Sequence, residues 1–212
     1  MSVSDNILIL HNSLPNNICL VAVSKTKPSN DILEAYNAGQ RHFGENKVQE
    51  LENKAKNLPT DIKWHMIGHL QTNKVKYIAP FVSLIHTVDS LKLLKEINKR
   101  AIQNDRVIDC LIQIKIAQEE TKFGMSENEA RNLLEFSISN VNIVGFMGMA
   151  TFSNDTKVVK EEFKRLKTFF DKSKKKFPNL EIISMGMSSD YQIAIEEGSN
   201  MIRLGSSIFG SR

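Results

Sequence analysis

The chain has 212 residues, of which 41% are hydrophobic and 25% are charged, and its net charge is +4. This composition is typical of a soluble globular protein, and the length favours one domain, spanning residues 1–212. No apolar run approaches the ~18 residues of a membrane span, so we expect no membrane partner. No basic region precedes the apolar patch 7–10, so we expect no signal peptide and a cytoplasmic protein.

The pattern of apolar residues predicts strands and helices that alternate along the chain. The first strand, 18–24, is an apolar run that ends at Lys25. Farther along the chain, Ser126 and Glu129 form a capping box, which predicts the start of a helix. After a weakly patterned segment, 1–17, that holds one short helix, the sequence predicts strands at 18–24, 41–43, 63–68, 83–87, 107–116, 142–147, 180–184 and 200–204, and helices at 29–38, after 46, at 72–79, at 91–103, after 126, at 156–176 and at 189–197.

Eight predicted strands with seven helices between them indicate a parallel sheet with right-handed crossovers. No linker interrupts the series, which favours a single closed (β/α)8 TIM barrel over an open doubly wound sheet. No Gly-x-Gly-x-x-Gly motif follows the first strand, which argues against a dinucleotide-binding fold. Because barrels of this kind build their sites at the carboxyl ends of the strands, we expect the functional side chains where each strand ends.

Three of these strand ends carry distinctive chemistry. Lys25 ends the first strand, where loss of solvent would lower the pKa of its amine and let it form a Schiff base; a solvated lysine is the alternative. The loops 186–189 and 205–207 combine glycine and serine after strands seven and eight, the usual phosphate site of this fold, with two ordinary helix caps as the alternative. Arg203 lies near the end of the last strand, where an arginine is costly unless a partner or ligand binds it.

These groups meet at one rim of the barrel, because strand one closes next to strand eight. An aldehyde-reactive amine, a phosphate cradle and a planar partner for a guanidinium together match pyridoxal 5′-phosphate (PLP). We therefore predict a PLP site and no catalytic residues. The strand-end residues predicted to bind the cofactor are Lys25, Asn46, Met66, His86, Ser188, Ser189, Arg203, Gly205 and Ser206.

Other kinds of site have weaker support. Cys19 and Cys110 fall in apolar strands and are interpreted as small buried thiols in a reducing compartment, and no group of side chains has the spacing of a metal site. His65 and His86 are candidate bases or metal ligands, but a lone histidine beside an apolar strand is more often a hydrogen-bonded core or pocket residue. The lysine run 172–176 lies at a helix end without interleaved aromatic residues, so we expect no nucleic-acid partner.

Four segments of the chain resemble the YggS/PROSC family of pyridoxal phosphate homeostasis proteins. These segments are 22–28, 39–46, 64–74 and 201–210, and the match extends in the expected order from about residue 18 to the end. The resemblance implies a barrel similar to the N-terminal domain of alanine racemase. It further implies that Lys25 carries PLP as an internal aldimine, that Asn46 lines the site and that Arg203 faces the pyridine nitrogen, with Lys27 an auxiliary or solvated charge. The phosphate would be held by Ser188, Ser189, Gly205 and Ser206.

We expect a carrier or regulator of PLP in the cell rather than a catalyst. Racemases of this fold add a β-rich domain with a tyrosine acid/base, and we expect this chain, which ends a few residues past strand eight, to lack it. Arginine at the pyridine nitrogen also disfavours protonation there by charge repulsion, which weakens the ring as an electron sink. A PLP-dependent racemase-type enzyme with weak activity and a Schiff-base aldolase remain the alternatives. The expected assembly is a monomer or weak homodimer, with apo-PLP enzymes as candidate partners.

Overall fold

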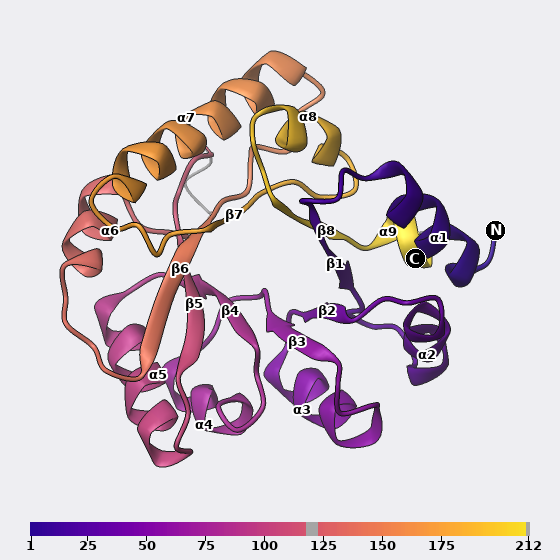
Figure 1. Cartoon of the computed structure of the whole chain (residues 1–212), viewed down its shortest axis with the longest axis horizontal. Coiled ribbons are helices and arrows are strands. Elements are labelled where there is room, and N and C mark those ends of the chain that lie inside the picture. The colour runs from indigo at the N-terminus through magenta and orange to yellow at the C-terminus, as the bar shows by residue number, and fades with distance from the viewer. Residues whose placement is uncertain (118–122, 211–212) are drawn as a thin grey trace.

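Eight parallel strands close into a barrel in the computed structural model, which describes residues 1–117 and 123–210. Each strand pairs with the next in chain order, β8 pairs with β1, and the helices form a ring around the strands (Figure 1). The structure therefore confirms the predicted (β/α)8 TIM barrel. The strands are β1 (Cys19–Val23), β2 (His42–Glu45), β3 (Lys63–Met66), β4 (Leu84–Val88), β5 (Ile108–Gln113), β6 (Val141–Met147), β7 (Ile182–Ser184) and β8 (Met201–Leu204).

Two helices, α5 and α6, begin at side-chain caps that the sequence indicates. The capping box before α6 forms as predicted, because Glu129 N–H donates to Ser126 Oγ while Ser126 N–H donates to Glu129 Oε2. Ser90 Oγ caps α5 by accepting from Leu93 N–H. The helices are α1 (Val3–Ser13), α2 (Ser29–Asn37), α3 (Val48–Asn57), the 3-10 turn η1 (Thr72–Lys74), α4 (Val75–Ile78), α5 (Leu91–Gln103), α6 (Glu127–Leu134), α7 (Thr156–Lys174), α8 (Tyr191–Glu196) and α9 (Ser206–Phe209).

Several predicted elements are shorter in the structure, such as the strands predicted at 63–68 and 180–184, which are Lys63–Met66 and Ile182–Ser184. The predicted helix at 72–79 divides into the turn η1 and the single turn α4. The predicted strand at 107–116 leaves the ladder at Gln113, and Ile114 instead forms an isolated bridge with Met125, before α6. Ile114 and Ile116 remain buried after β5 has ended, so hydrophobicity alone overestimates the length of this strand.

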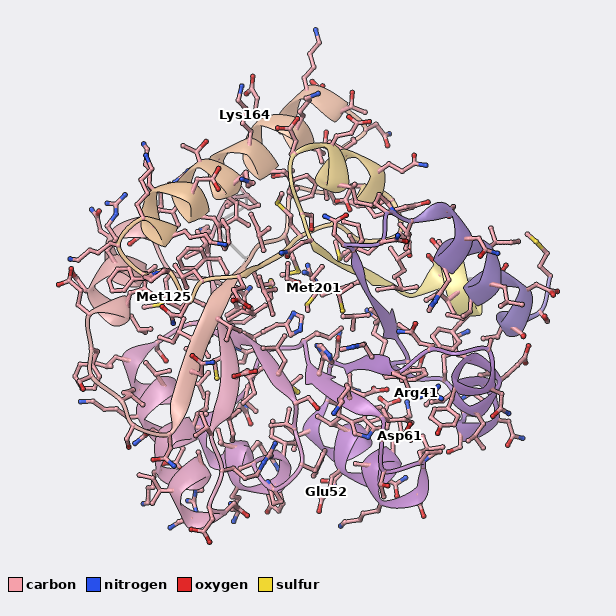
Figure 2. The ribbon with its side chains drawn as sticks, in the orientation of Figure 1. Arg41, Glu52, Asp61, Met125, Lys164 and Met201 are labelled. Atoms are coloured by element: carbon pink, nitrogen blue, oxygen red, sulfur yellow. The ribbon has the colours of Figure 1, made fainter. Side chains whose placement is uncertain are left out.

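The apolar core has two parts. The larger lies between the strands and the surrounding helices, and the smaller fills part of the barrel interior. Figure 2 shows Met201, from the interior cluster, near the centre of the ring, whereas Glu52 and Lys164 lie at its outer edge. The interior cluster of buried residues is Val21, Leu84, Leu111, Val144, Met147 and Met201. Polar side chains fill other parts of the interior and reach the site described below.

The first and last helices lie side by side, so the two ends of the described chain meet near β1 and β8 (Figure 1). Asn6 Nδ2 donates to the carbonyl of Ile208 at 2.9 Å, which ties α1 to α9. This contact matters for the site, because α9 directly follows the loop after β8. Within residues 1–117 and 123–210, no helix has both the length and the apolar character needed to cross a membrane.

Candidate functional site

A cavity of about 850 Å³ lies at the carboxyl ends of the strands. This is the end at which barrels of this type hold their ligands. Seven of the predicted residues line it, namely Lys25, Asn46, Ser188, Ser189, Arg203, Gly205 and Ser206. The remaining lining residues are Val23, Thr26, Lys27, Ile67, Met149, Phe152, Met187, Ser207 and Gly210.

Lys25 is held at the cavity by a tight turn that follows β1. Ser24 N–H donates to Gly44 O at 3.1 Å, and Lys27 N–H turns back to Ser24 O at 3.0 Å. Thr26 has a φ of 65°, a conformation that a β-branched residue rarely adopts, and its N–H donates to Glu50 Oε1 at 2.6 Å. The backbone on both sides of Lys25 is therefore fixed, and its half-buried side chain enters the cavity.

A buried ionic cluster lies directly behind this turn. Lys54 Nζ, from α3, donates to Ser24 O at 2.8 Å, to Glu45 Oε1 at 2.8 Å and to Glu50 Oε1 at 2.6 Å. Ser24 Oγ also donates to Glu45 Oε1. Burial raises the pKa of Glu45, against the opposing hydrogen bonds from Lys54 and Ser24. The cluster supports the backbone of Lys25 from outside the barrel. The sequence did not indicate this role, because Lys54 lies in a polar helix and its neighbours in the sequence do not distinguish it from a solvated lysine.

Arg203 is a buried cation with neutral partners. It is 4% exposed, and it donates from Nη1 to Ser184 Oγ at 2.6 Å and from Nη2 to Gly148 O at 3.2 Å. Burial lowers its pKa to about 10, with Asp190 opposing, so the guanidinium is charged at neutral pH. Among the described residues it makes no ion pair, which leaves a desolvated charge beside the cavity that suits a ligand lone pair.

The loops after β7 and β8 meet at Ser188. Its Oγ accepts from the N–H groups of Gly205 at 3.2 Å and Ser207 at 3.4 Å. Gly186 permits this approach, because its φ is 97° and a Cβ there would lie 2.6 Å from Ala194 Cβ. Two backbone donors and a hydroxyl therefore converge in one small region, an arrangement that suits an oxyanion.

Asn46 and Lys27 complete the cavity wall. Gly68 packs against the backbone of Asn46 so closely that a Cβ on Gly68 would lie 2.2 Å from Asn46 O. Lys27 Nζ donates to Phe209 O at 2.9 Å, at the end of α9, which gives this lysine a structural hydrogen bond. Lys25 and Lys27 therefore differ in environment although both line the cavity.

Met66 and His86 were predicted to bind the cofactor with the other strand-end residues, but they are not among the residues that line the cavity. Met66 is fully buried in the core shared with the helices, because alternation along the strand directs the next residue, Ile67, to the cavity instead. His86 lies fully buried below the cavity, where its Nδ1 contacts Ser184 Oγ at 3.2 Å. Ser184 links it to Arg203, which donates to the same hydroxyl oxygen.

Phe152 lines the cavity although the sequence did not indicate it. It is 87% exposed in the loop after β6. Met149 and Met187 also line the cavity, as their positions just past the ends of β6 and β7 indicate. In the part of the chain that the structure describes, no three His, Cys, Asp or Glu side chains group as metal ligands would.

Comparison with known proteins is consistent with this geometry. The family model described as alanine racemase, N-terminal domain, matches residues 2–212. A pyridoxal phosphate homeostasis protein of Aquifex aeolicus is 40% identical over 197 residues, which cover 91% of this chain and 86% of the relative. The human protein of the same name is 40% identical over 210 residues, covering 91% and 76%.

Solved structures agree with these matches. PipY of Synechococcus elongatus PCC7942, determined with PLP bound, has a TM-score of 0.91 and 34% identity, covering 99% of this chain and 100% of that chain. An alanine racemase of Clostridium difficile 630 has a TM-score of 0.84 at 14% identity, covers 100% of this chain and 60% of its own, and shares the fold alone. The chain therefore belongs to the YggS/PROSC family of pyridoxal phosphate homeostasis proteins, whose barrel is of the alanine racemase N-terminal-domain type.

Proposed function

We propose that this protein binds PLP in the cavity at the carboxyl ends of the strands and acts as a carrier or regulator in PLP homeostasis. One observation carries the proposal: Lys25, Arg203 and the loop at Ser188 line the same cavity. The names of its relatives and the PLP bound to PipY support it.

The cavity offers a matched partner for each reactive part of the ligand. Arg203 is buried with neutral partners and would donate to the lone pair of the ring nitrogen. Ser188, with the N–H groups of Gly205 and Ser207, would bind the phosphate, and Ser189 and Ser206 lie beside them. The residues present therefore fit PLP.

Lys25 is the lysine best suited to hold the aldehyde carbon, through a Schiff base. The amines of the two neighbouring lysines are engaged, Lys27 by Phe209 O and Lys54 by three acceptors. Among the described residues no hydrogen bond occupies the Lys25 amine, and its side chain lies in the cavity. An amine that no other group holds is the one available as a nucleophile.

The charge of Arg203 favours a protein that retains PLP over one that turns over amino acids. When bound, PLP supplies an aldehyde that condenses with an amine and a ring that can withdraw electrons from a substrate. The guanidinium is charged at neutral pH, so it opposes a proton on the adjacent ring nitrogen and weakens that withdrawal. We therefore expect the protein to hold and release PLP with little or no turnover of amino acids.

The absorbance spectrum of purified protein with added PLP tests this proposal. We expect the wild type to show a visible band that free PLP lacks, Lys25→Ala to lose that band, and Lys27→Ala to retain it. Absence of the band from the wild type at saturating PLP would contradict the proposal. Amino-acid-dependent α-proton exchange by the wild type would instead support a racemase-type enzyme.

A further inference from the structure

A hydrogen-bonded chain crosses the barrel interior from one end to the other. It begins at His42 on β2 and passes through His65 on β3, His86 on β4 and Ser184 on β7 to Arg203 on β8. The successive distances are 2.9 Å from His42 Nδ1 to His65 Nε2, 2.8 Å from His65 Nδ1 to His86 Nε2, 3.2 Å from His86 Nδ1 to Ser184 Oγ and 2.6 Å from Ser184 Oγ to Arg203 Nη1.

The inner members of this chain are sealed from water. His65 is 2% exposed, and His86 and Ser184 are fully buried beside the apolar interior cluster defined above. A buried polar group left without a partner costs about 1–3 kcal/mol, so each donor and acceptor in the chain must be used.

Arg203 fixes the direction of every hydrogen bond in the chain. A guanidinium can only donate hydrogen bonds, so Ser184 Oγ accepts one from Arg203. The Ser184 hydroxyl then donates its own hydrogen bond to His86 Nδ1. His86 must then carry its proton on Nε2 and donate to His65, and His65 in turn donates from Nε2 to His42. The reverse direction would leave the Ser184 hydroxyl proton without an acceptor among the described residues.

The two ends of the chain open on different cavities. Arg203 lines the candidate site, whereas the half-buried His42 lines a second cavity of about 480 Å³ that also includes His11 and Gln40. Burial lowers the pKa of all three histidines of the chain, to about 3 for His65, so each is neutral at pH 7. Neutral imidazoles can both accept and donate, as the chain requires.

We propose that His65 and His86 are positioning residues that act through Ser184 to hold the Arg203 guanidinium against the cavity. Ser184 Oγ accepts a hydrogen bond from Nη1 of the guanidinium, and Gly148 O accepts one from Nη2. The remaining donors are then directed toward a ring nitrogen of a bound ligand. This inference rests on the proposed function, because PLP supplies that nitrogen.

Nitrogen NMR of the five histidines tests the direction of the chain without any ligand. We expect His42, His65 and His86 to carry their proton on Nε2 at pH 7. Each resonance is assigned from a variant in which that one histidine is replaced. A proton on Nδ1 of His65 or His86 would overturn the inference.

Binding of PLP and of an analogue with carbon in place of the ring nitrogen tests the role. We expect His86→Phe to weaken PLP binding by about tenfold and to change binding of the analogue by less than about twofold. Ser184→Ala should give the same pattern and is the second variant if His86→Phe does not fold. His69→Phe is the matched control, because His69 is half-exposed and is not a member of the hydrogen-bonded chain. This substitution should leave the affinities for PLP and for the analogue unchanged.

Two outcomes distinguish the inference from the proposed function. If His86→Phe and Ser184→Ala weaken PLP and the analogue equally, the histidines have a general structural role and the inference is overturned, while PLP binding by the wild type stands. If the wild type binds neither compound, the proposed function itself fails, and the NMR measurement still decides whether the chain has the stated direction.

Discussion

Lys54 Nζ lies 2.8 Å from Glu45 Oε1, and both side chains are buried directly behind the turn that carries Lys25. The same ammonium also bonds the carbonyl of Ser24, the residue before Lys25. An ion pair between α3 and β2 therefore fixes the backbone of the proposed Schiff-base lysine from outside the cavity.

Removal of the Lys54 charge should destabilise the protein strongly. In Lys54→Met the buried Glu45 carboxylate loses its cation, and we expect the free energy of unfolding, measured with urea, to fall by about 3–5 kcal/mol. Lys56→Met, which breaks the exposed pair with Glu52, is the matched control and should cost about 0.5 kcal/mol or less. Equal effects of the two substitutions would contradict the role given to Lys54.

The buried histidines should make stability fall as the pH is lowered. Burial lowers the pKa of His65 from 6.5 to about 3, so between these values the unfolded chain binds a proton that the folded protein excludes. The free energy of unfolding then decreases with decreasing pH, by at most about 1.4 kcal/mol per pH unit for this residue. We expect His65→Phe to show a shallower slope than the wild type in urea titrations between pH 6.5 and pH 4. Parallel curves would show that His65 is not held neutral by folding.

Ser188 and Ser189 should differ in their effect on phosphate binding. Ser188 Oγ lies where the N–H groups of Gly205 and Ser207 converge, whereas Ser189 is exposed. We expect Ser188→Ala to weaken binding of PLP by about tenfold or more and to leave binding of pyridoxal, which lacks the phosphate, nearly unchanged. Ser189→Ala should have the smaller effect on PLP. A larger loss in Ser189→Ala would place the phosphate elsewhere in the cavity.

Gly68 should be intolerant of a side chain because of its contact with Asn46. A Cβ at Gly68 would lie 2.2 Å from Asn46 O, so Gly68→Ala must displace the backbone that presents Asn46 to the cavity. We expect PLP affinity, measured by fluorescence titration, to fall by about tenfold or more. An unchanged affinity in Gly68→Ala would exclude Asn46 from the site.

The order of elements was predictable because the local signals agreed with the packing. Most strands of this barrel are largely buried, so they appear in the sequence as short apolar runs; β2 and β3, with the sequences HFGE and KWHM, are the exceptions. The helix at 91–103 was placed correctly at both ends, since Ser90 supplies its cap. The strand at 107–116 was overextended, because Ile114 and Ile116 remain buried after the ladder has ended.

The residues of the site were predictable only where position along the strand was sufficient. Lys25, Arg203 and Ser188 line one cavity, as expected from strands of a barrel that end at one rim. Met66 is buried in the core and does not line the cavity, because the sequence does not fix which residues of a strand end face inward. Lys54 and His42 were missed because their partners lie on other elements, at separations that carry no local pattern.

Reductive trapping tests the central claim most directly. Borohydride fixes a Schiff base as a stable amine, so mass spectrometry of peptides from PLP-treated, reduced protein identifies the lysine that holds the cofactor. The account predicts the added mass of reduced pyridoxyl phosphate on Lys25, with Lys27 and Lys54 unmodified because their amines are already hydrogen-bonded. Modification of another lysine in place of Lys25, or none at saturating PLP, would contradict it.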